Sequence, residues 1–223
     1  MCGRMTITEP ERIVRKFKAD VNKATLDKPR FNIAPSQIVP ALIARDEQHI
    51  LGDLQWGLVP YWAEDPAIGN RMINARAETV ATKPSFRSAF RKRRCLIPAD
   101  GYYEWQKTVG GKQPVYIRID NGAAFAFAGL YEIWTGPDET KLSTCTIITT
   151  TPNDALASIH HRMPVILDED GWHDWLGGDN ADIGALQDML VPFDPSRTTA
   201  YPVSTRVNSP RNDDAGCIAS IAA

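Results

Sequence analysis

The sequence predicts an α+β fold, with residues 1–223 forming a single domain around a strongly bent, mostly antiparallel, barrel-like sheet with flanking helices. Three observations support this prediction. Short apolar segments of strand length recur through the middle of the chain, and helical patterns fall before and after them. The 16 prolines are spread along the 223 residues rather than gathered in a linker. A chain of this length can bury a substantial core.

The first predicted element is a helix that ends near Ala19. Thr8 is its expected N-cap, because Glu11 follows at the spacing of a capping box and Pro10 falls in the first turn. The inner face of this helix would hold apolar side chains, namely Ile13, Val14 and Phe17.

Strands and helices then follow in two groups. The predicted strands are 38–44, 50–56, 95–98, 115–120, 123–130 and 142–150. Asn121-Gly122 has the composition of a two-residue hairpin turn between two of them. The predicted helices in the second half are 153–159, 169–176 and 181–190.

The charge is unevenly distributed, although the net charge is only −2. Residues 1–100 carry 17 Lys and Arg against 11 Asp and Glu, and residues 101–223 carry 8 against 16. The basic excess peaks at 83–94, where six Lys and Arg occur without an acidic residue. Two interpretations stay open for this segment: a solvated face, or a surface that faces nucleic-acid phosphates.

Composition also argues against several classes of protein. The longest apolar runs are far short of the roughly 20 residues that a membrane helix needs. The first residues lack the apolar region of a secretory signal, so a cytoplasmic protein without disulfides is expected. The four cysteines form no CxxC pair and no zinc-ligand spacing, and no nucleotide-binding glycine motif occurs. We therefore expect no metal and no cofactor.

The cysteines differ in their surroundings. Cys95 and Cys145 lie in apolar, strand-like segments and are expected to be buried core thiols, as is Cys217. Cys2 follows Met1 directly, and removal of Met1 would leave an α-amine and a thiol on the same residue. Its position alone favours an ordinary penultimate cysteine.

Five segments combine glycine, proline, aromatic and charged residues in ways that core packing does not require. They are NIAPSQ (32–37), WGLVPYWA (56–63), NARAET (74–79), PADGYYEW (98–105) and IHHRMP (159–164). Taken singly, Asn74 could be a turn residue, Glu104 a strand residue paired with an arginine, and His160 or His161 a surface histidine. No G-x-S-x-G nucleophile motif is present.

Taken together, MCGR, NARAET, GYYEW, H-x-RMP and PVSTRVN resemble the SRAP family, the SOS-response-associated peptidases, whose members shield abasic sites in single-stranded DNA. The resemblance runs from Cys2 to about Asn208. It implies that Cys2 is the nucleophile, surrounded by Asn74, Glu104 and His160. In H-x-RMP, His161 fills a variable position at which family members commonly carry an acidic residue.

The chemistry of these residues suits the implied reaction. An α-amine is roughly 10–20% neutral at pH 7, against well under 0.1% for a lysine. It would attack the ring-opened aldehyde to give a Schiff base, and the Cys2 thiol would then close a thiazolidine, favoured by proximity. Glu104 would act as acid and base, His160 would move a second proton, and Asn74 would orient the amine or sugar. Strand cleavage by β-elimination would be a minor outcome.

The resemblance also implies a DNA-binding surface. Arg4, Arg76 and Arg162 each lie two positions after a proposed catalytic residue, and arginine suits phosphate binding. Further DNA-binding candidates are Asn32, Pro35, Trp62 and Thr149, and Trp56 lies in the same cleft-forming motifs. The expected partner is single-stranded DNA containing abasic sites, bound by a monomer that associates with the nucleoid and with no membrane.

Two rival functions remain. An N-terminal-nucleophile cysteine peptidase or amidase would use the same Cys2 with its α-amine as base. A non-covalent binder of single-stranded or modified DNA would not need Cys2 at all. Replacing Cys2 by alanine separates these readings, because only the non-covalent binder would be indifferent to the change.

Overall fold

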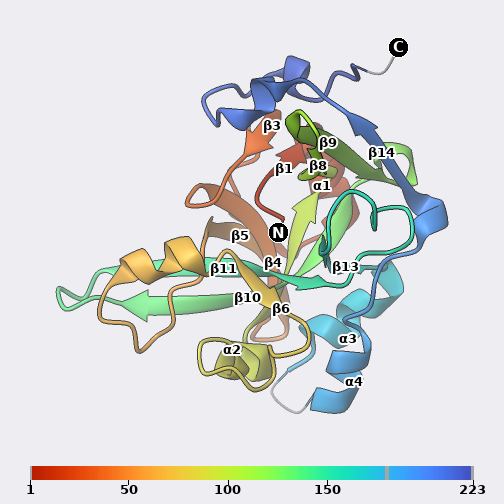
Figure 1. The fold of residues 1–223 in the computed structure, drawn as a ribbon. Coiled ribbons are helices and arrows are strands. Elements are labelled where there is room, and N and C mark those ends of the chain that lie inside the picture. The colour runs from red at the N-terminus through yellow and green to blue at the C-terminus, as the bar shows by residue number, and fades with distance from the viewer. Residues whose placement is uncertain (1, 179–180, 222–223) are drawn as a thin grey trace.

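A ring of five strands forms the centre of the molecule (Figure 1). The computed structural model describes residues 2–178 and 181–221. The ring strands are β4 (Ile38–Arg45), β5 (Gln48–Trp56), β7 (Arg94–Ala99), β10 (Phe125–Thr135) and β11 (Lys141–Thr150). Each is antiparallel to its neighbours except where β5 pairs in parallel with β11, at Gln55 and Thr144, and closes the ring. The predicted barrel-like sheet is therefore confirmed.

Short strands extend this sheet. They are β2 (Val21–Asn22) on β5, β6 (Asn74–Arg76) and β12 (Met163–Pro164) on β11, and β13 (Ile166–Leu167) on β10. The strands β6 and β12 both lie against the second half of β11, where Thr149 pairs with Arg76 on one side and Pro164 on the other. Segments distant in the sequence are thereby brought together at one end of β11.

A second, antiparallel sheet lies above the ring in the view of Figure 1. Its strand order is β14 (Thr198–Pro202), β9 (Gly111–Ile119), β8 (Gly101–Thr108), β1 (Met5–Ile7) and β3 (Arg30–Ile33). Because β1 lies between β8 and β3, the start of the chain runs through the interior of the fold rather than along its edge.

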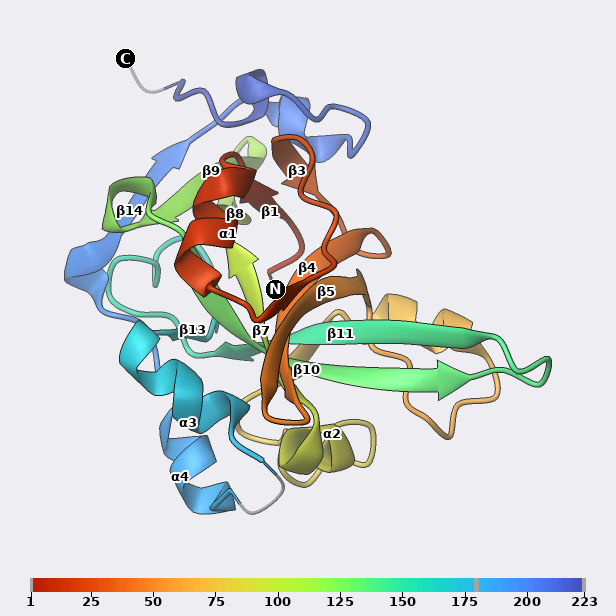
Figure 2. The same cartoon turned by 180° about the vertical axis from the view of Figure 1, so that it is seen from behind.

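Helices are few and short. The α-helices are α1 (Pro10–Phe17), α2 (Arg87–Lys92), α3 (Trp172–Leu176) and α4 (Ile183–Asp188). The 3-10 turns are η1 (Pro66–Arg71), η2 (Asp120–Gly122), η3 (Glu169–Gly171), η4 (Pro195–Arg197), η5 (Thr205–Asn208) and η6 (Ala215–Cys217). In α1, Ile13 and Phe17 are buried as predicted, and the Phe17 ring stacks on Trp172 at 4.5 Å, whereas Val14 is 40% exposed. Figure 2 shows α1 from the rear face of the molecule.

Three local predictions were wrong. Thr8 does not cap α1, because its amide and hydroxyl both donate to the Asp100 carboxylate, and Glu9 takes the cap position. Asn121-Gly122 forms no hairpin, because β9 before it and β10 after it lie in different sheets. Residues 153–159 form successive turns rather than a helix. The helix predicted at 169–176 is present over those residues as η3 followed by α3, and the helix predicted at 181–190 is present in shortened form as α4.

One apolar cluster contains side chains from both sheets, from Met5 and Tyr102 to Leu96 and Ile147. Cys95 and Cys145 are buried in it, as predicted. A smaller cluster packs the C-terminal segment against β8 and β9, and it buries Cys217. Among the described residues, no helix has the length and apolar character to cross a membrane.

Candidate active site

The pairing of β1 with β8 places the first residues of the chain beside Glu104. Met5 lies opposite Tyr102 and Thr6 opposite Gly101, and the Tyr103 amide donates to the Arg4 carbonyl at 3.0 Å. Continuing this antiparallel register brings the chain before Arg4 alongside Glu104. A Cβ at Gly101 would lie 2.1 Å from the Tyr116 hydroxyl, so the close packing at the start of β8 requires glycine.

The alternation of side chains along β8 separates two environments. Tyr102 packs into the large core cluster that also contains Cys2, whereas Tyr103 packs into the smaller cluster with the C-terminal segment. Glu104 lies on the Tyr102 side by the same alternation. The carboxylate is therefore directed to the buried face of β8 on which Cys2 also lies.

Cys2 is fully buried. Burial raises the pKa of its thiol well above the ordinary value, and the nearby negative charge of Glu104 raises it further. The thiol is therefore held in its neutral form at physiological pH. It remains a thiol until a base removes its proton.

Glu104 is 3% exposed, and burial raises the pKa of its carboxyl to about 7. A carboxyl with this pKa is populated in both protonation states near neutral pH, which suits a general acid or base. Glu104 Oε2 lies 3.8 Å from His160 Nδ1. Both residues line a cavity of about 470 Å³, together with Trp105, Lys107 and Lys112.

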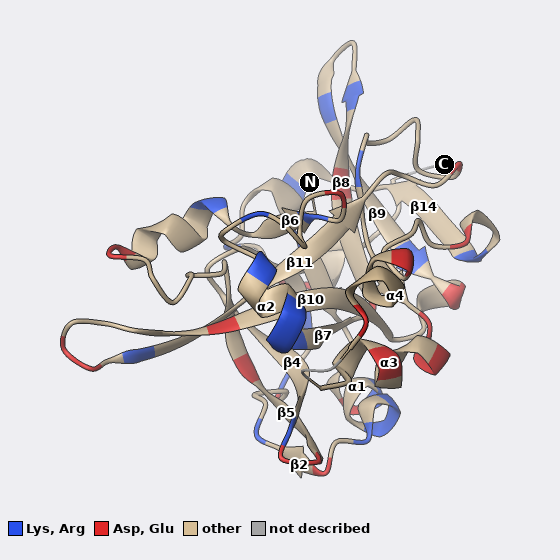
Figure 3. Ribbon diagram, turned by 90° about the horizontal axis from the view of Figure 1, so that it is seen from below, with Lys and Arg blue, Asp and Glu red and all other residues tan. Residues whose placement is uncertain are grey.

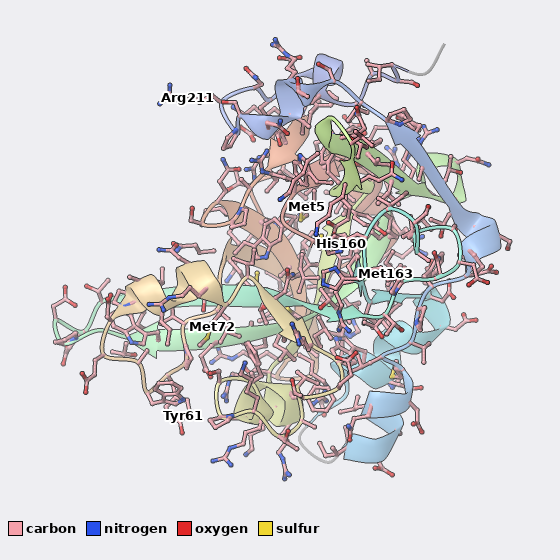
Figure 4. The ribbon with its side chains drawn as sticks, viewed as in Figure 1. Met5, Tyr61, Met72, His160, Met163 and Arg211 are labelled. Atoms are coloured by element: carbon pink, nitrogen blue, oxygen red, sulfur yellow. The ribbon has the colours of Figure 1, made fainter. Side chains whose placement is uncertain are left out.

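His160 lies in the loop before β12 (Figure 4). Its Nδ1 lies 3.1 Å from both the amide nitrogen and the carbonyl oxygen of Arg162, and its ring packs against that of His161 with 4.3 Å between centroids. Partial burial lowers the pKa of His160, and the charges of His161 and Arg162 contribute in the same direction. The imidazole is therefore biased toward its neutral form, able to accept a proton.

Asn74 enters from β6, on the other side of β11. Its Nδ2 donates to the Ile147 carbonyl at 3.4 Å. Its Oδ1 is buried and accepts no hydrogen bond in the described part of the chain. A buried amide oxygen without a donor is costly, so this atom is available to a ligand that brings one.

Arg162 is anchored by protein partners. Its guanidinium donates two hydrogen bonds to the Glu78 carboxylate, at 2.5 and 3.0 Å, and a third to the Thr149 carbonyl at 2.5 Å. Glu78 was not singled out from the sequence, although it stands within NARAET next to other candidates. The paired hydrogen bonds between Arg162 and Glu78 could not be predicted from the sequence, because they form only where β6 and β12 both lie against β11.

Arg4 and Asn32 tie the site to the C-terminal segment. Arg4 Nη1 donates to Asn32 Oδ1 at 2.6 Å and to the Val207 carbonyl at 2.5 Å. Asn32 is 1% exposed, and its Nδ2 donates to three carbonyls, those of Val207, Ser209 and Asn212. In this structure the Asn32 amide holds protein segments together and has no surface to offer a ligand.

The remaining candidates lie toward the surface. Arg76 is exposed at the end of β6, Pro35 is half-buried in the turn before β4, and Trp62 is 48% exposed after β5. Trp56 differs from the expectation for a cleft residue: it is 1% exposed, and its Nε1 donates to the Ile73 carbonyl at 2.9 Å. Trp56 is therefore part of the core.

The fold thus brings the sequence candidates together in part. Cys2, Glu104 and His160 gather on the buried face of β8, and Thr149 and Arg162 lie on β11 and beside β12. Asn32 and Trp56 are structural, and Trp62 lies apart on the surface. Among the described residues, no group of three His, Cys, Asp or Glu side chains is arranged to hold a metal ion.

Comparison with known proteins identifies relatives over the whole chain. The abasic site processing protein YoqW of Bacillus subtilis is 45% identical over 223 residues, covering 99% of this chain and 100% of that protein. The abasic site processing protein HMCES of Gallus gallus is 33% identical and covers 87% of this chain and 67% of that protein.

Fold and family comparisons agree with these relatives. A crystal structure of a protein from Bacteroides thetaiotaomicron superposes with a TM-score of 0.89 at 25% identity, covering 99% of this chain and 100% of that one. The family model described as SOS response associated peptidase (SRAP) matches residues 1–210. The chain therefore belongs to the SOS response associated peptidase family.

Proposed function

We propose that this protein recognises abasic sites in single-stranded DNA and shields them by a covalent link to Cys2, after removal of Met1. The observation that carries the proposal is the buried thiol of Cys2 on the same face of β8 as Glu104, which lies 3.8 Å from His160. The relatives named as abasic site processing proteins support the choice of lesion.

The first step uses the α-amine that Met1 removal would leave on Cys2. The amine nitrogen attacks the aldehyde carbon of the ring-opened deoxyribose, and the carbinolamine formed loses one water to give a Schiff base. Glu104, with a pKa raised to about 7, donates a proton to the sugar ring oxygen as the ring opens and regains one from the C1 hydroxyl that becomes the aldehyde. The reprotonated carboxyl then donates to the departing hydroxyl of the carbinolamine. His160 accepts the proton that the amine releases.

The second step uses the thiol of the same residue. Its sulfur bonds to the imine carbon while the thiol proton passes to the nitrogen, which closes the thiazolidine. Overall, an aldehyde, an amine and a thiol give the ring and one water. Because the sulfur and the nitrogen belong to one residue, the bond between the sulfur and the imine carbon forms within a single molecule and is strongly favoured. Asn74, whose Oδ1 accepts no hydrogen bond in the described part of the chain, orients the amine or the sugar hydroxyl.

The DNA-binding candidates fall into two groups of residues. Arg76, Pro35 and Trp62 lie near or at the surface, where a guanidinium can bind phosphate and an indole can stack on a base. In the second group, Arg4 is hydrogen-bonded to Asn32, and Arg162 is hydrogen-bonded to Thr149. We propose that this second group shapes the cleft, and that Arg4 and Arg162 add positive charge to it.

Two further activities fit the same site. Where thiazolidine closure is blocked, the Schiff base is also the first species of β-elimination, so weak strand cleavage would follow. A cysteine peptidase acting through Cys2 is the alternative that the family description suggests. We further expect a monomer acting in the cytoplasm.

The test is denaturing electrophoresis with intact-mass measurement after mixing the protein with single-stranded DNA that carries one abasic site. We expect a heat-stable adduct whose mass is the sum of protein lacking Met1 and DNA, less one water. Cys2→Ala should form no thiazolidine adduct. Cys2→Ser keeps the amine and should give a linkage that needs borohydride reduction to survive.

Cys217→Ala is the matched control, because it removes a buried thiol from the other cluster and should cross-link as the wild type does. Protein beginning at Cys2 that yields no adduct would contradict the proposal. An adduct formed equally by Cys2→Ala would place the chemistry elsewhere. Cys2-dependent cleavage of peptides without any DNA adduct would favour the peptidase.

A further inference from the structure

Five of the six cations in the basic segment 83–94 fall into two sets in the fold. Arg93 donates to Glu132 at 2.8 Å, and Arg94 is buried with its guanidinium donating to backbone carbonyls, including that of Trp175 at 2.6 Å. These two side chains stabilise the packing of α2 against β7 and β10. Their positive charges are therefore not available to an outside partner.

Three other cations form a row on the outside. Lys83, Arg87 and Arg91 are exposed and spaced four residues apart. Arg87 and Arg91 lie on α2, about 6 Å apart along one face. Lys83 lies in the turn just before the helix, where its carbonyl accepts a hydrogen bond from the Arg87 amide at 2.9 Å. The opposite face packs into the core through Phe86, Ala89 and Phe90.

Little negative charge opposes this row. The sequence from 79 to 99 has no acidic residue. Glu78, just before it, is bound to Arg162, and Glu132 on β10 is bound to Arg93. Within the described part of the chain, Lys83, Arg87 and Arg91 form no ion pair of their own, and Figure 3 shows blue segments on α2 separated by tan, without red.

The row is connected to the candidate site by a short stretch of chain. The strand β6, which carries Asn74, ends at Arg76, and Lys83 follows seven residues later. Figure 1 shows α2 beyond the end of β6, on the side away from the second sheet. Arg76 is itself exposed, so cations continue from the edge of the site to the helix.

We propose that Lys83, Arg87 and Arg91 bind the phosphate backbone of the DNA strand that leads away from the lesion. This inference rests on the proposed function and adds to it a second contact region, outside the reactive pocket. A DNA strand carries one negative charge per nucleotide, and a row of cations with a regular step can follow it without reading sequence. These backbone contacts would determine the affinity for DNA and the direction in which the strand runs, and they would take no part in the reaction at Cys2.

The test compares the wild type with the triple variant Lys83→Gln, Arg87→Gln, Arg91→Gln. Binding of a long, undamaged single strand is measured by fluorescence anisotropy over a series of salt concentrations. Loss of three phosphate contacts should reduce the slope of log K against log salt by about 2 for a single strand. In parallel, cross-linking rates are measured for a long abasic oligonucleotide and for a short one that ends beside the lesion. The ratio of the cross-linking rate on the long oligonucleotide to the rate on the short one should be lower in the triple variant than in the wild type.

The matched control is Lys18→Gln, Lys23→Gln, Lys28→Gln, which removes the same charge from exposed positions that follow α1, on the rear side in Figure 2. It should retain the wild-type slope and ratio. If the slope falls equally in both triple variants, net charge alone explains the effect and the inference is wrong. An unchanged slope in the α2 variant would also overturn the inference. If the wild type forms no adduct at all, the proposed function fails, while the slope measurement still decides the α2 surface.

Discussion

Glu104 shows how a single residue acquires its properties from its position in a strand. From the sequence, Tyr103 and Trp105 are the neighbours expected to desolvate this carboxyl. The structure assigns Tyr103 to the opposite face of β8, in the cluster with the C-terminal segment. Desolvation instead comes from the core side, where Tyr102 and Cys2 are fully buried. The raised pKa agrees with the expected desolvation, but Tyr103 is not its source, whereas Trp105 lines the same cavity as Glu104.

Replacing Glu104 by glutamine should change how stability depends on pH. The carboxyl has a pKa of about 7 in the fold, against 4.5 for the unperturbed group. Below pH 4.5 the Glu104 carboxyl is protonated in both the folded and the unfolded protein, so folding buries no charge there. Above pH 7 the folded protein carries a buried carboxylate, a loss of about 3 kcal/mol. Glu104→Gln lacks this loss.

Urea denaturation between pH 4 and pH 8 measures this effect. The stability of Glu104→Gln relative to wild type should rise as the pH increases through this window and should level off above about pH 7 to 8. A stability difference that does not change with pH would contradict a raised pKa at Glu104. Glu47→Gln, at an exposed turn, is a suitable control.

Residue identity alone selected the candidate reactive groups but not the residues that hold them in place. Cys2, Glu104 and His160 could be selected because each has titratable chemistry and stands in a motif of the family. Glu78 and Asp100 could not, because their roles arise from partners far along the chain: Arg162 for Glu78, and Thr6 with Thr8 for Asp100. Such pairs depend on tertiary contacts, which cannot be predicted from a local sequence pattern.

At the scale of elements, the ring strands were predictable and the second sheet was less so. β4, β10 and β11 contain long apolar stretches because consecutive residues on both faces of each strand are buried in the core. The short strands β1, β3 and β6 have three or four residues, too few to show a period. The turn at Asn121-Gly122 was recognised, but a turn signal does not tell which strands pair across it.

The strand β3 is held to the C-terminal segment by Asn32, and removing its amide should loosen that segment. Asn32→Ala deletes three donated hydrogen bonds at a buried position and leaves the Ser209 carbonyl without the amide that donates to it, a cost of about 2 kcal/mol in the free energy of unfolding. Amide hydrogen exchange should rise in residues 207–212. Asn22→Ala, at an exposed position with one local hydrogen bond, should leave both unchanged.

At the scale of the whole molecule, the shared core makes a prediction about unfolding. The large apolar cluster contains Met5 and Tyr102 of the second sheet and Leu96 and Ile147 of the ring. Neither sheet can separate without exposing part of the same core, so residues 1–223 should unfold as one unit. Tryptophan fluorescence and far-UV circular dichroism should give coincident transitions in denaturant. Two resolved transitions would show that the sheets are independently stable.

The burial of Cys2 has a consequence for the lifetime of the protein in a stressed cell. Peroxides oxidise cysteine through its thiolate, and the pKa of the Cys2 thiol is raised well above its ordinary value. Few thiolates are present at neutral pH, and the sulfur is closed to solvent. The oxidants that damage DNA bases would therefore consume the Cys2 thiol slowly, so that the nucleophile we propose would persist until a lesion enters the site.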